Sequence, residues 1–376
     1  MIAFFSEALP PSPNGNAVML HRLLKNNEGF DYCFISSYEE FYKTKSEPLP
    51  CEHYYLHEPI RESRCFVFAI LRSVFRIIYS VFSLAKLIKS KKIELLVVCT
   101  GDLIGIPVGY LASRIKKKPF VLYMFDDYLE QWSGLRACFA RYSGRFIIPK
   151  ADVVIVPNEF IKNKLDNQFG IDCELVRNPS CATTKAEVNI ITIQENINIL
   201  YTGAIYDAQA RAIEELSMCL KETGFKLNIF TSSDVSDYKF FQNENVSIMP
   251  FVKQSELEEL HQQNDILFLP LCKTSNLDSV IMTAAPGKMG EYLASGKIIL
   301  AFVPENCFVD FLLKKHEAAL VCNTLKELRD ELLSCKEGRQ DQGRLIMNAL
   351  ELSQEFSIEI NMLKLNTVIL RSVVVK

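Results

Sequence analysis

The sequence lacks the short motifs that identify several common protein classes. Its twelve cysteines include no Cys-x-x-Cys pair, the spacing that zinc ribbons and redox sites use. Gly-x-Gly-x-x-Gly and Gly-x-x-x-x-Gly-Lys-Ser/Thr are also absent, which argues against a dinucleotide fingerprint and a P-loop. His53 and His57 are four residues apart but lack the glutamate of a His-Glu-x-x-His metal site, so we expect them in a loop. The cysteines are expected to be reduced and mostly buried.

The sequence has little excess of charge of either sign. It contains 42 Lys and Arg against 45 Asp and Glu, a net charge of −3, with 49% apolar and 23% charged residues. These values are typical of soluble globular proteins. Proteins that bind nucleic acid carry a clear basic excess, so no nucleic-acid partner is expected. The chain opens on an apolar strand rather than on a basic segment with a cleavage site, which predicts a cytoplasmic protein.

Continuous apolar segments alternate with helical segments along the 376 residues. This alternation is typical of parallel β-sheets that are covered on both faces. Strands are expected at the N-terminus and at 94–100, 119–125, 151–157, 174–179, 197–203, 226–232, 246–252, 265–271 and 297–303. The predicted fold class is therefore α/β, with two Rossmann-like doubly wound domains that face each other across a cleft.

The polar residues 181–196 show no steady periodicity and predict a linker between the domains. We expect an N-terminal acceptor domain at 1–180 and a C-terminal donor domain at 197–352. The final helices, at 353–376, are expected to pack back on the N-terminal domain. Ligands of such folds bind beyond the carboxyl ends of the strands, so the loops after the strands are the places where chemistry is expected.

Two of these loops contain a glycine between a strand and a helix. Gly15 lies in PPSPNGN, and Gly203 follows the strand at 197–203. Glycine lets the backbone approach a ligand closely, and a helix start offers unpaired N–H groups to an anion. Both loops are candidate phosphate sites, with an ordinary strand-to-helix turn as the alternative. Arg211 would add positive charge after the second loop, although a surface position is the favoured interpretation.

The segment TAAPGKMGEYLASGK at 283–297 carries the most specific pattern. Lys288 stands at the start of a predicted helix, where its charge opposes the helix dipole. That placement is explained if the lysine meets a phosphate. Glu291 would accept hydrogen bonds from a ribose diol, as carboxylates do in other nucleotide sites. A capping role for Glu291 and a solvated Lys288 are the alternative.

Several segments together resemble one family. PGKMGEYLASGKIILA is similar to the P-x-K-x-x-E-Y-L-A-x-G-K segment of retaining glycosyltransferases with the GT-B fold, the family 4-like enzymes of bacterial surface-polysaccharide biosynthesis. PFVLYMFDD, ADVVIVPNEF, LVRNP and LYTGAIYDAQ resemble other segments of that family in the same order. The resemblance covers most of the chain and implies a transferase of hexosyltransferase type. It would move a sugar from a nucleotide-sugar donor to a glycan or lipid-linked acceptor, with retention.

The resemblance assigns donor-binding roles to residues of the C-terminal domain. Glu291 corresponds to the glutamate that binds the donor ribose. Lys288 and the Gly203 loop correspond to positions near the diphosphate, and Phe251 and Val252 belong to the segment that holds the base. The nucleotide sugar would be a substrate, with no further cofactor. No metal ion is expected either, because no Asp-x-Asp triplet stands at a strand end.

On the N-terminal side, Gly15 corresponds to the loop that approaches the donor phosphates. The catalytic candidates are Asp126 and Asp127, at the acidic position near the transferred sugar and the acceptor. Two departures from the family pattern stand out: Thr283 replaces the first glutamate of E-x7-E, and the Gly203 loop has no basic residue before Arg211. These departures make a non-catalytic homologue that binds a nucleotide sugar or a partner one alternative. A nucleotide-sugar 2-epimerase, a different enzyme class on the same fold, is the other.

Residues 61–118 contain twelve basic and three acidic residues, a local net charge of +9. The apolar segment at 65–88 includes Arg72 and Arg76, whose charges would be costly at the centre of a bilayer. It therefore predicts an amphipathic helix rather than a membrane span. Such a surface suits peripheral docking on the anionic inner face of a membrane, where a lipid-linked acceptor would be met. A packed helix beside a solvated lysine cluster is the alternative.

Overall fold

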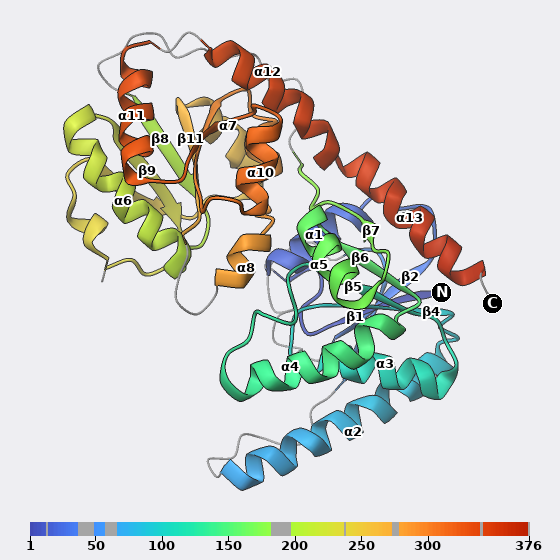
Figure 1. Ribbon diagram of the computed structural model, residues 1–376. Helices are drawn as coiled ribbons and strands as arrows, with labels where there is room; N and C mark the ends of the chain where they lie inside the picture. The colour runs from blue at the N-terminus through green and yellow to red at the C-terminus, as the bar shows by residue number, and fades with distance from the viewer. Residues whose placement is uncertain are drawn as a thin grey trace. The chain divides into compact units, whose positions relative to one another are not determined.

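The computed structural model describes residues 1–12, 14–36, 49–56, 66–181, 197–236, 238–272, 278–338 and 341–374. They form two compact units, which we call unit 1 (Met1–Pro179 with Ile358–Lys376) and unit 2 (Ser180–Ser357). Each unit is built on its own parallel β-sheet (Figure 1). The predicted linker at 181–196 lies outside the described residues except for its first residue.

Unit 1 has a seven-stranded sheet with the order β3-β2-β1-β4-β5-β6-β7. Its strands are β1 (Ile2–Ser6), β2 (Tyr32–Ser36), β3 (Glu52–Tyr55), β4 (Leu95–Cys99), β5 (Phe120–Tyr123), β6 (Val153–Val156) and β7 (Glu174–Leu175). Its helices are α1 (Gly15–Leu24), α2 (Phe66–Ser90), α3 (Gly105–Lys116), α4 (Gly134–Ile147), the short η2 (Ile148–Lys150), α5 (Glu159–Phe169) and α13 (Ile358–Val374).

Helices cover both faces of this sheet because successive side chains of a strand point to opposite faces. Phe5 and Leu96 pack with residues of α2, α3, α4 and α5 on one face. Phe4 and Val97 pack with residues of α1 and α13 on the other. The C-terminal helix α13 therefore belongs to the core of unit 1. None of the helices among the described residues is both long and apolar enough to cross a membrane.

Unit 2 has a six-stranded sheet with the order β10-β9-β8-β11-β12-β13. Its strands are β8 (Asn198–Thr202), β9 (Lys226–Thr231), β10 (Val246–Pro250), β11 (Ile266–Pro270), β12 (Ile298–Phe302) and β13 (Leu320–Cys322). Its helices are α6 (Asp207–Thr223), η3 (Lys239–Gln242), η4 (Gln254–Glu256), α7 (Leu257–Gln262), α8 (Asp278–Thr283), α9 (Met289–Leu293), α10 (Phe308–Lys315), α11 (Leu325–Lys336), α12 (Gln342–Ser353) and η5 (Gln354–Phe356).

The strand order of each sheet reverses at one place. In unit 1 the chain leaves β3 at the sheet edge and returns as β4 beside β1. In unit 2 it leaves β10 and returns as β11 beside β8. Open α/β sheets bind ligands at such switch points, beyond the carboxyl ends of the two central strands. Gly15 follows β1 and Gly203 follows β8, so both glycine loops lie at a switch point.

The predicted α/β class with two doubly wound Rossmann-like domains is confirmed. β2, β3 and β13 were not predicted, and His53 lies in β3 rather than in the expected loop. The strand expected at 174–179 covers only Glu174–Leu175. It ends there because the Arg177 N–H donates to the Asn361 side chain of α13, at 2.8 Å, rather than to a neighbouring strand. Seven of the eleven described cysteines are buried, as expected.

Candidate functional site

Lys288 reaches into the switch point of unit 2. It is the N-cap residue of α9, which fixes its backbone at the carboxyl edge of the sheet. Its Nζ donates a hydrogen bond to the Thr202 carbonyl oxygen at 2.6 Å and lies 3.9 Å from the centroid of the Tyr201 ring. Gly203 has a φ of +119°, and a Cβ built on it would lie 3.0 Å from the same nitrogen. Only glycine combines that backbone conformation with this close approach.

The position of Lys288 disfavours the charged form of its side chain. Burial disfavours the charged form and lowers the pKa of Lys288 to about 7, while the nearby Glu291 carboxylate opposes the shift. Near neutral pH the side chain is therefore divided between its charged and neutral forms. An anion bound beside Lys288 would stabilise the charged form of its side chain.

Glu291 lies on the first turn of α9 and is buried. Its charge reaches His261 of α7, whose pKa is lowered to about 4 mainly by burial. The His261 ring stands edge-on to Tyr292 with 5.4 Å between centroids, and its Nε2 is buried with no hydrogen-bond partner among the described residues. The Tyr292 hydroxyl is 3.4 Å from the Thr202 hydroxyl. These groups form one polar cluster around α9.

Two members of this cluster, Tyr292 and His261, are not among the site residues predicted from the sequence. Tyr292 is part of the Glu-Tyr-Leu-Ala segment, so the sequence pattern contained a signal that could have identified it. His261 gave no local signal, because only the fold brings α7 against α9. An imidazole that burial keeps neutral, with an unsatisfied nitrogen, is available to a ligand that binds beside Glu291.

Phe251 and Val252 follow β10 directly. β10 is two strands from β8 in the sheet, so this segment lies on the same carboxyl edge as Lys288, roughly 10 Å along it. The Phe251 side chain is 58% exposed. An exposed aromatic ring at a separation of nucleoside size from a phosphate site is suited to stacking on a base.

Thr283, where the family pattern has its first glutamate, is the last residue of α8. Its hydroxyl oxygen is 3.3 Å from the Val280 carbonyl oxygen, to which it donates a hydrogen bond one turn back in the same helix. The position therefore adds no negative charge to the cluster. At residue 283 this chain therefore lacks the carboxylate that the family pattern has there.

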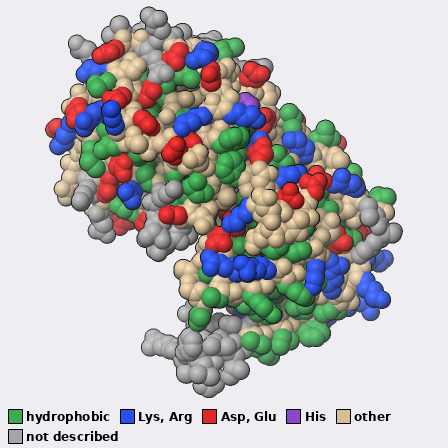
Figure 2. Space-filling view, in the orientation of Figure 1, with side chains coloured by type: hydrophobic (Ala, Val, Ile, Leu, Met, Phe, Trp, Pro, Cys, Tyr) green, Lys and Arg blue, Asp and Glu red, His purple; other side chains and the backbone are tan. Residues whose placement is uncertain are grey.

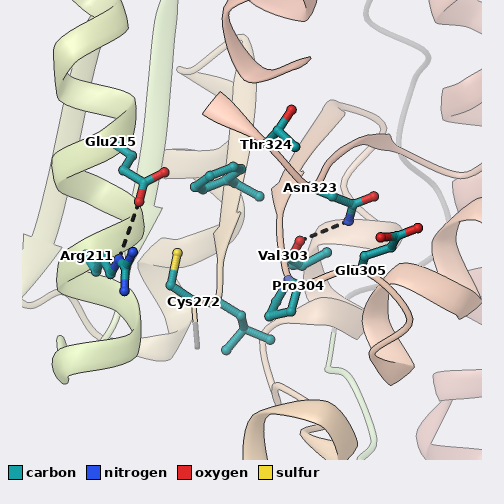
Figure 3. Close-up of a pocket in the computed structure, with 10 residues that line it drawn as sticks. Arg211, Glu215, Cys272, Val303, Pro304, Glu305, Asn323 and Thr324 are labelled. Carbon is teal, nitrogen blue, oxygen red and sulfur yellow. Dashed lines mark hydrogen bonds and ion pairs between the residues drawn. The ribbon is translucent and has the colours of Figure 1, made fainter. Parts of the chain in front are cut away.

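A cavity of about 320 Å³ opens elsewhere on the carboxyl edge of unit 2, after β11, β12 and β13 (Figure 3). Two contacts within the protein involve polar side chains of its lining. Arg211 Nε lies 3.4 Å from Glu215 Oε1, and the Asn323 amide donates to the Val303 carbonyl oxygen at 2.9 Å. None of the predicted donor-binding residues lines it. The surface interpretation of Arg211 is therefore favoured over a phosphate contact.

Gly15 begins α1 at the switch point of unit 1. A Cβ built on it would meet no atom of the described part of the chain within 4 Å. The Asn14 side chain caps the helix by accepting from the Asn16 N–H, and the Asn16 amide donates to the Thr100 carbonyl oxygen at 3.2 Å. These contacts fix the start of α1 to the end of β4.

Asp126 and Asp127 follow β5 and have different surroundings. Asp127 is only 2% exposed; one of its oxygens accepts from the Leu129 N–H at 3.1 Å, and the other is paired with Lys164 of α5. Asp126 is half-buried, and its pKa is raised by burial and, to a smaller extent, by the charge of Asp127. Asp127 is thus held in an internal ion pair. Of the two predicted catalytic aspartates, Asp126 is the one whose side chain is partly accessible.

No protein-family model and no curated protein matches the sequence. Among solved structures, Anabaena Alr3699/HepE in complex with UDP and glucose has a TM-score of 0.70, with 13% identity over 98% of both chains. The lipopolysaccharide outer core galactosyltransferase WaaB has a TM-score of 0.67, with 16% identity over 98% of this chain and 99% of its own. Acinetobacter baumannii MurG has a TM-score of 0.58, with 15% identity over the same shares. The chain therefore has the GT-B fold.

Proposed function

We propose that the protein is a glycosyltransferase that moves a sugar from a nucleotide-sugar donor to a glycan or lipid-linked acceptor in polysaccharide biosynthesis. The observation that carries this proposal is the cluster of Gly203, Lys288 and Glu291 at the switch point of unit 2. It combines a close backbone approach, a lysine whose pKa is lowered to about 7 by burial, and a carboxylate one turn away. A diphosphate joined to a ribose diol matches this set of groups.

The solved structures support UDP as the nucleotide to test first. Alr3699/HepE was crystallised with UDP and glucose, with UDP alone and with UDP-glucose. We infer that the present chain holds a uridine nucleotide with its diphosphate at Lys288, its ribose at Glu291 and its base against Phe251. His261 and Tyr292 would stabilise the geometry of the part of the site that holds the ribose.

Transfer breaks the bond between the anomeric carbon of the sugar and a diphosphate oxygen. Negative charge grows on the leaving diphosphate, where the Lys288 ammonium and the N–H groups of the Gly203 loop would stabilise it. The acceptor hydroxyl forms the new bond and loses its proton to the leaving phosphate, on the same face of the sugar, which gives retention. Asp126 orients the acceptor or the sugar. We propose no obligatory metal ion, because these groups supply the charge compensation.

A non-catalytic protein that binds a nucleotide sugar is the second candidate. The observation that favours it is Thr283, whose hydroxyl is bonded into α8 and which carries no charge. A nucleotide-sugar 2-epimerase would use the same donor site without an acceptor. Product analysis separates the three activities: a new glycosidic bond, an altered sugar in the absence of acceptor, or nucleotide-sugar binding without turnover.

The basic segment at 61–118 extends the proposal to location. We propose a cytoplasmic protein that docks at the inner face of the membrane, where a lipid-linked acceptor is available. Arg61 and Arg64 lie outside the described residues, and the side chain of Arg72 is not described. The proposed membrane location therefore rests on the other basic residues of this segment, which lie on or just after α2 and α3.

The first experiment measures the thermal stability of the protein with a panel of nucleoside diphosphates and nucleotide sugars. A ligand that binds only the folded state raises the Tm. We expect uridine nucleotides to do so, and Lys288→Met to remove the effect. Lys297→Met is the matched control, because Lys297 is a buried lysine of unit 2 whose ammonium also donates to a backbone carbonyl, that of Gln262, at 2.9 Å. Folded protein that responds to no nucleotide would contradict the proposal.

A further inference from the structure

Three helices on one face of unit 1 carry positive charge only. α2, α3 and α4 contribute residues to the same apolar core beneath them. Their sequences contain nine basic residues and no Asp or Glu. The basic residues are Arg72, Arg76, Lys86, Lys89, Arg114, Lys116, Arg136, Arg141 and Arg145. A run of helices without a carboxylate is unusual for a solvated surface, which normally mixes both signs of charge.

The outward sides of the same helices are apolar. On α4, Leu135, Phe139, Tyr142 and Phe146 recur at intervals of four, three and four residues, which places them in one stripe. Tyr142 is 83% exposed and Leu135 is 75% exposed. The described residues include 21 exposed large hydrophobic side chains, and eleven of them lie on these helices. The others in this set are Val74, Phe75, Ile78, Tyr79 and Phe82 of α2, and Leu111 and Ile115 of α3.

The exposed apolar side chains of α2, α3 and α4 belong to one surface, which we call the helical face. α3 packs between α2 and α4, and the Tyr110 ring of α3 meets the Phe146 ring of α4 edge-on, with 6.3 Å between centroids. Cations lie among the rings: Arg114 is 5.2 Å from the centroid of Tyr110, and Lys150 Nζ is 3.0 Å from that of Phe146. Figure 2 shows hydrophobic side chains gathered over the lower part of unit 1, with Lys and Arg beside them.

We propose that the helical face docks on the surface of an anionic lipid bilayer. Apolar and aromatic side chains flanked by Lys and Arg are what an interfacial segment presents to acyl chains and anionic headgroups. A second copy of the same face would oppose cation to cation, so charge complementarity argues against self-association. The sequence analysis placed the basic surface between 61 and 118. The structure adds α4 and shows that apolar rings, rather than the arginines alone, face outward.

This inference deepens the proposed function, because it rests on a lipid-linked acceptor. α4 begins at Gly134, eight residues after Asp126, and α3 begins shortly after β4. Both helices therefore start at the carboxyl edge of the sheet, where Asp126 lies. A bilayer under the helical face would hold an acceptor headgroup near the loop that carries the acceptor-side carboxylate.

The test is sedimentation of the full chain with vesicles of phosphatidylcholine alone or mixed with phosphatidylglycerol. We expect binding that rises with the anionic lipid fraction and falls with salt. Phe82→Glu and Tyr142→Glu should each weaken it about tenfold or more, since an added carboxylate opposes both the acyl chains and the headgroups. Arg136→Gln and Arg145→Gln should each weaken binding to the mixed vesicles roughly fivefold. Met218→Glu and Met347→Glu, at exposed positions of unit 2, are matched controls and should bind as the native chain does.

Three outcomes would overturn the inference. The native chain could fail to sediment with anionic vesicles, or the unit 2 controls could lose as much binding as the α2 and α4 variants. The protein could also prove dimeric in sedimentation velocity and become monomeric in Tyr142→Glu, which would make the helical face a contact between copies. Each variant is also tested for stabilisation by UDP. Loss of vesicle binding with that stabilisation retained separates the docking surface from the donor site.

Discussion

The two units have the same architecture and place different chemistry at the same point. In each, the strand order of a parallel sheet reverses beside its first strand, and a glycine loop follows that strand. In unit 2 the switch point holds a half-buried lysine, a carboxylate and a neutral histidine. In unit 1 it holds an open glycine, with a half-buried aspartate two strands further along. The fold supplies the location, and a few loop residues decide what can bind there.

The outer helices of the two units differ as well. α6 and α11 of unit 2 mix both signs of charge and are joined by the ion pair of Arg329 and Glu222 at 3.1 Å. α2, α3 and α4 of unit 1 carry no carboxylate and expose aromatic rings. This difference is consistent with the division of roles that we propose, with donor binding in unit 2 and acceptor and membrane contacts in unit 1.

The largest effect is expected from Asp126→Asn. Removing a carboxylate that orients the acceptor should lower the rate of sugar transfer by about 100- to 1,000-fold. Stabilisation by UDP should be unchanged, because the donor groups are in unit 2. The rate is measured as UDP release with acceptor present, and the Tm shift with UDP is the control. A variant with a normal transfer rate would remove the acceptor role from unit 1.

Lys288→Met should weaken UDP binding by roughly 10- to 100-fold, since a hydrogen bond to a charged group contributes about 1.5–3 kcal/mol. Calorimetric titration measures the Kd. Lys297→Met should leave it unchanged, and a loss of equal size in both variants would mean that any buried lysine of unit 2 affects binding through stability alone.

The affinity for a nucleotide sugar should fall as the pH rises above 7. The pKa of Lys288 in the unliganded protein is about 7, so above that pH the lysine must take up a proton when the diphosphate binds. The loss is about tenfold per pH unit until the raised pKa of the complex is reached. UDP-glucose is the suitable ligand, because its pyrophosphate does not titrate in this range. Lys288→Arg stays charged and should bind with little pH dependence; a slope that persists in this variant would assign the titration to another group.

The smallest effect, on the stability of the fold, is expected from Asp127→Ala, and it distinguishes Asp127 from Asp126. Asp127→Ala should lower the free energy of unfolding by about 1–3 kcal/mol, because it removes the partner of Lys164 and of the Leu129 N–H. The low end is favoured, since Lys164 is partly exposed and can turn to water. Urea denaturation measures the change, and UDP binding should be retained. Stability equal to that of the native chain would leave Asp127 available for catalysis.

Much of the fold was accessible from the sequence because its signal is local. Apolar strands between helices predicted the parallel sheets, and the order of the segments placed Gly203, Lys288 and Glu291 in one domain. What could not be predicted depends on distant contacts. The buried Asp127 is paired with Lys164, which lies on the separate helix α5. His261, on α7, contacts Tyr292 of α9. The apolar stripe of α4 has the periodicity of a core-facing helix, so only the structure shows that it points to solvent.

The most direct test of the account is amide hydrogen exchange of the protein with and without UDP. If unit 2 holds the diphosphate at its switch point, UDP should slow exchange at 201–206 and 286–293, with smaller effects near Phe251. The cavity lined by Arg211, Cys272, Asn323 and Thr324 should be unaffected. Protection confined to that cavity, or protection found only in unit 1, would contradict the assignment of the donor site.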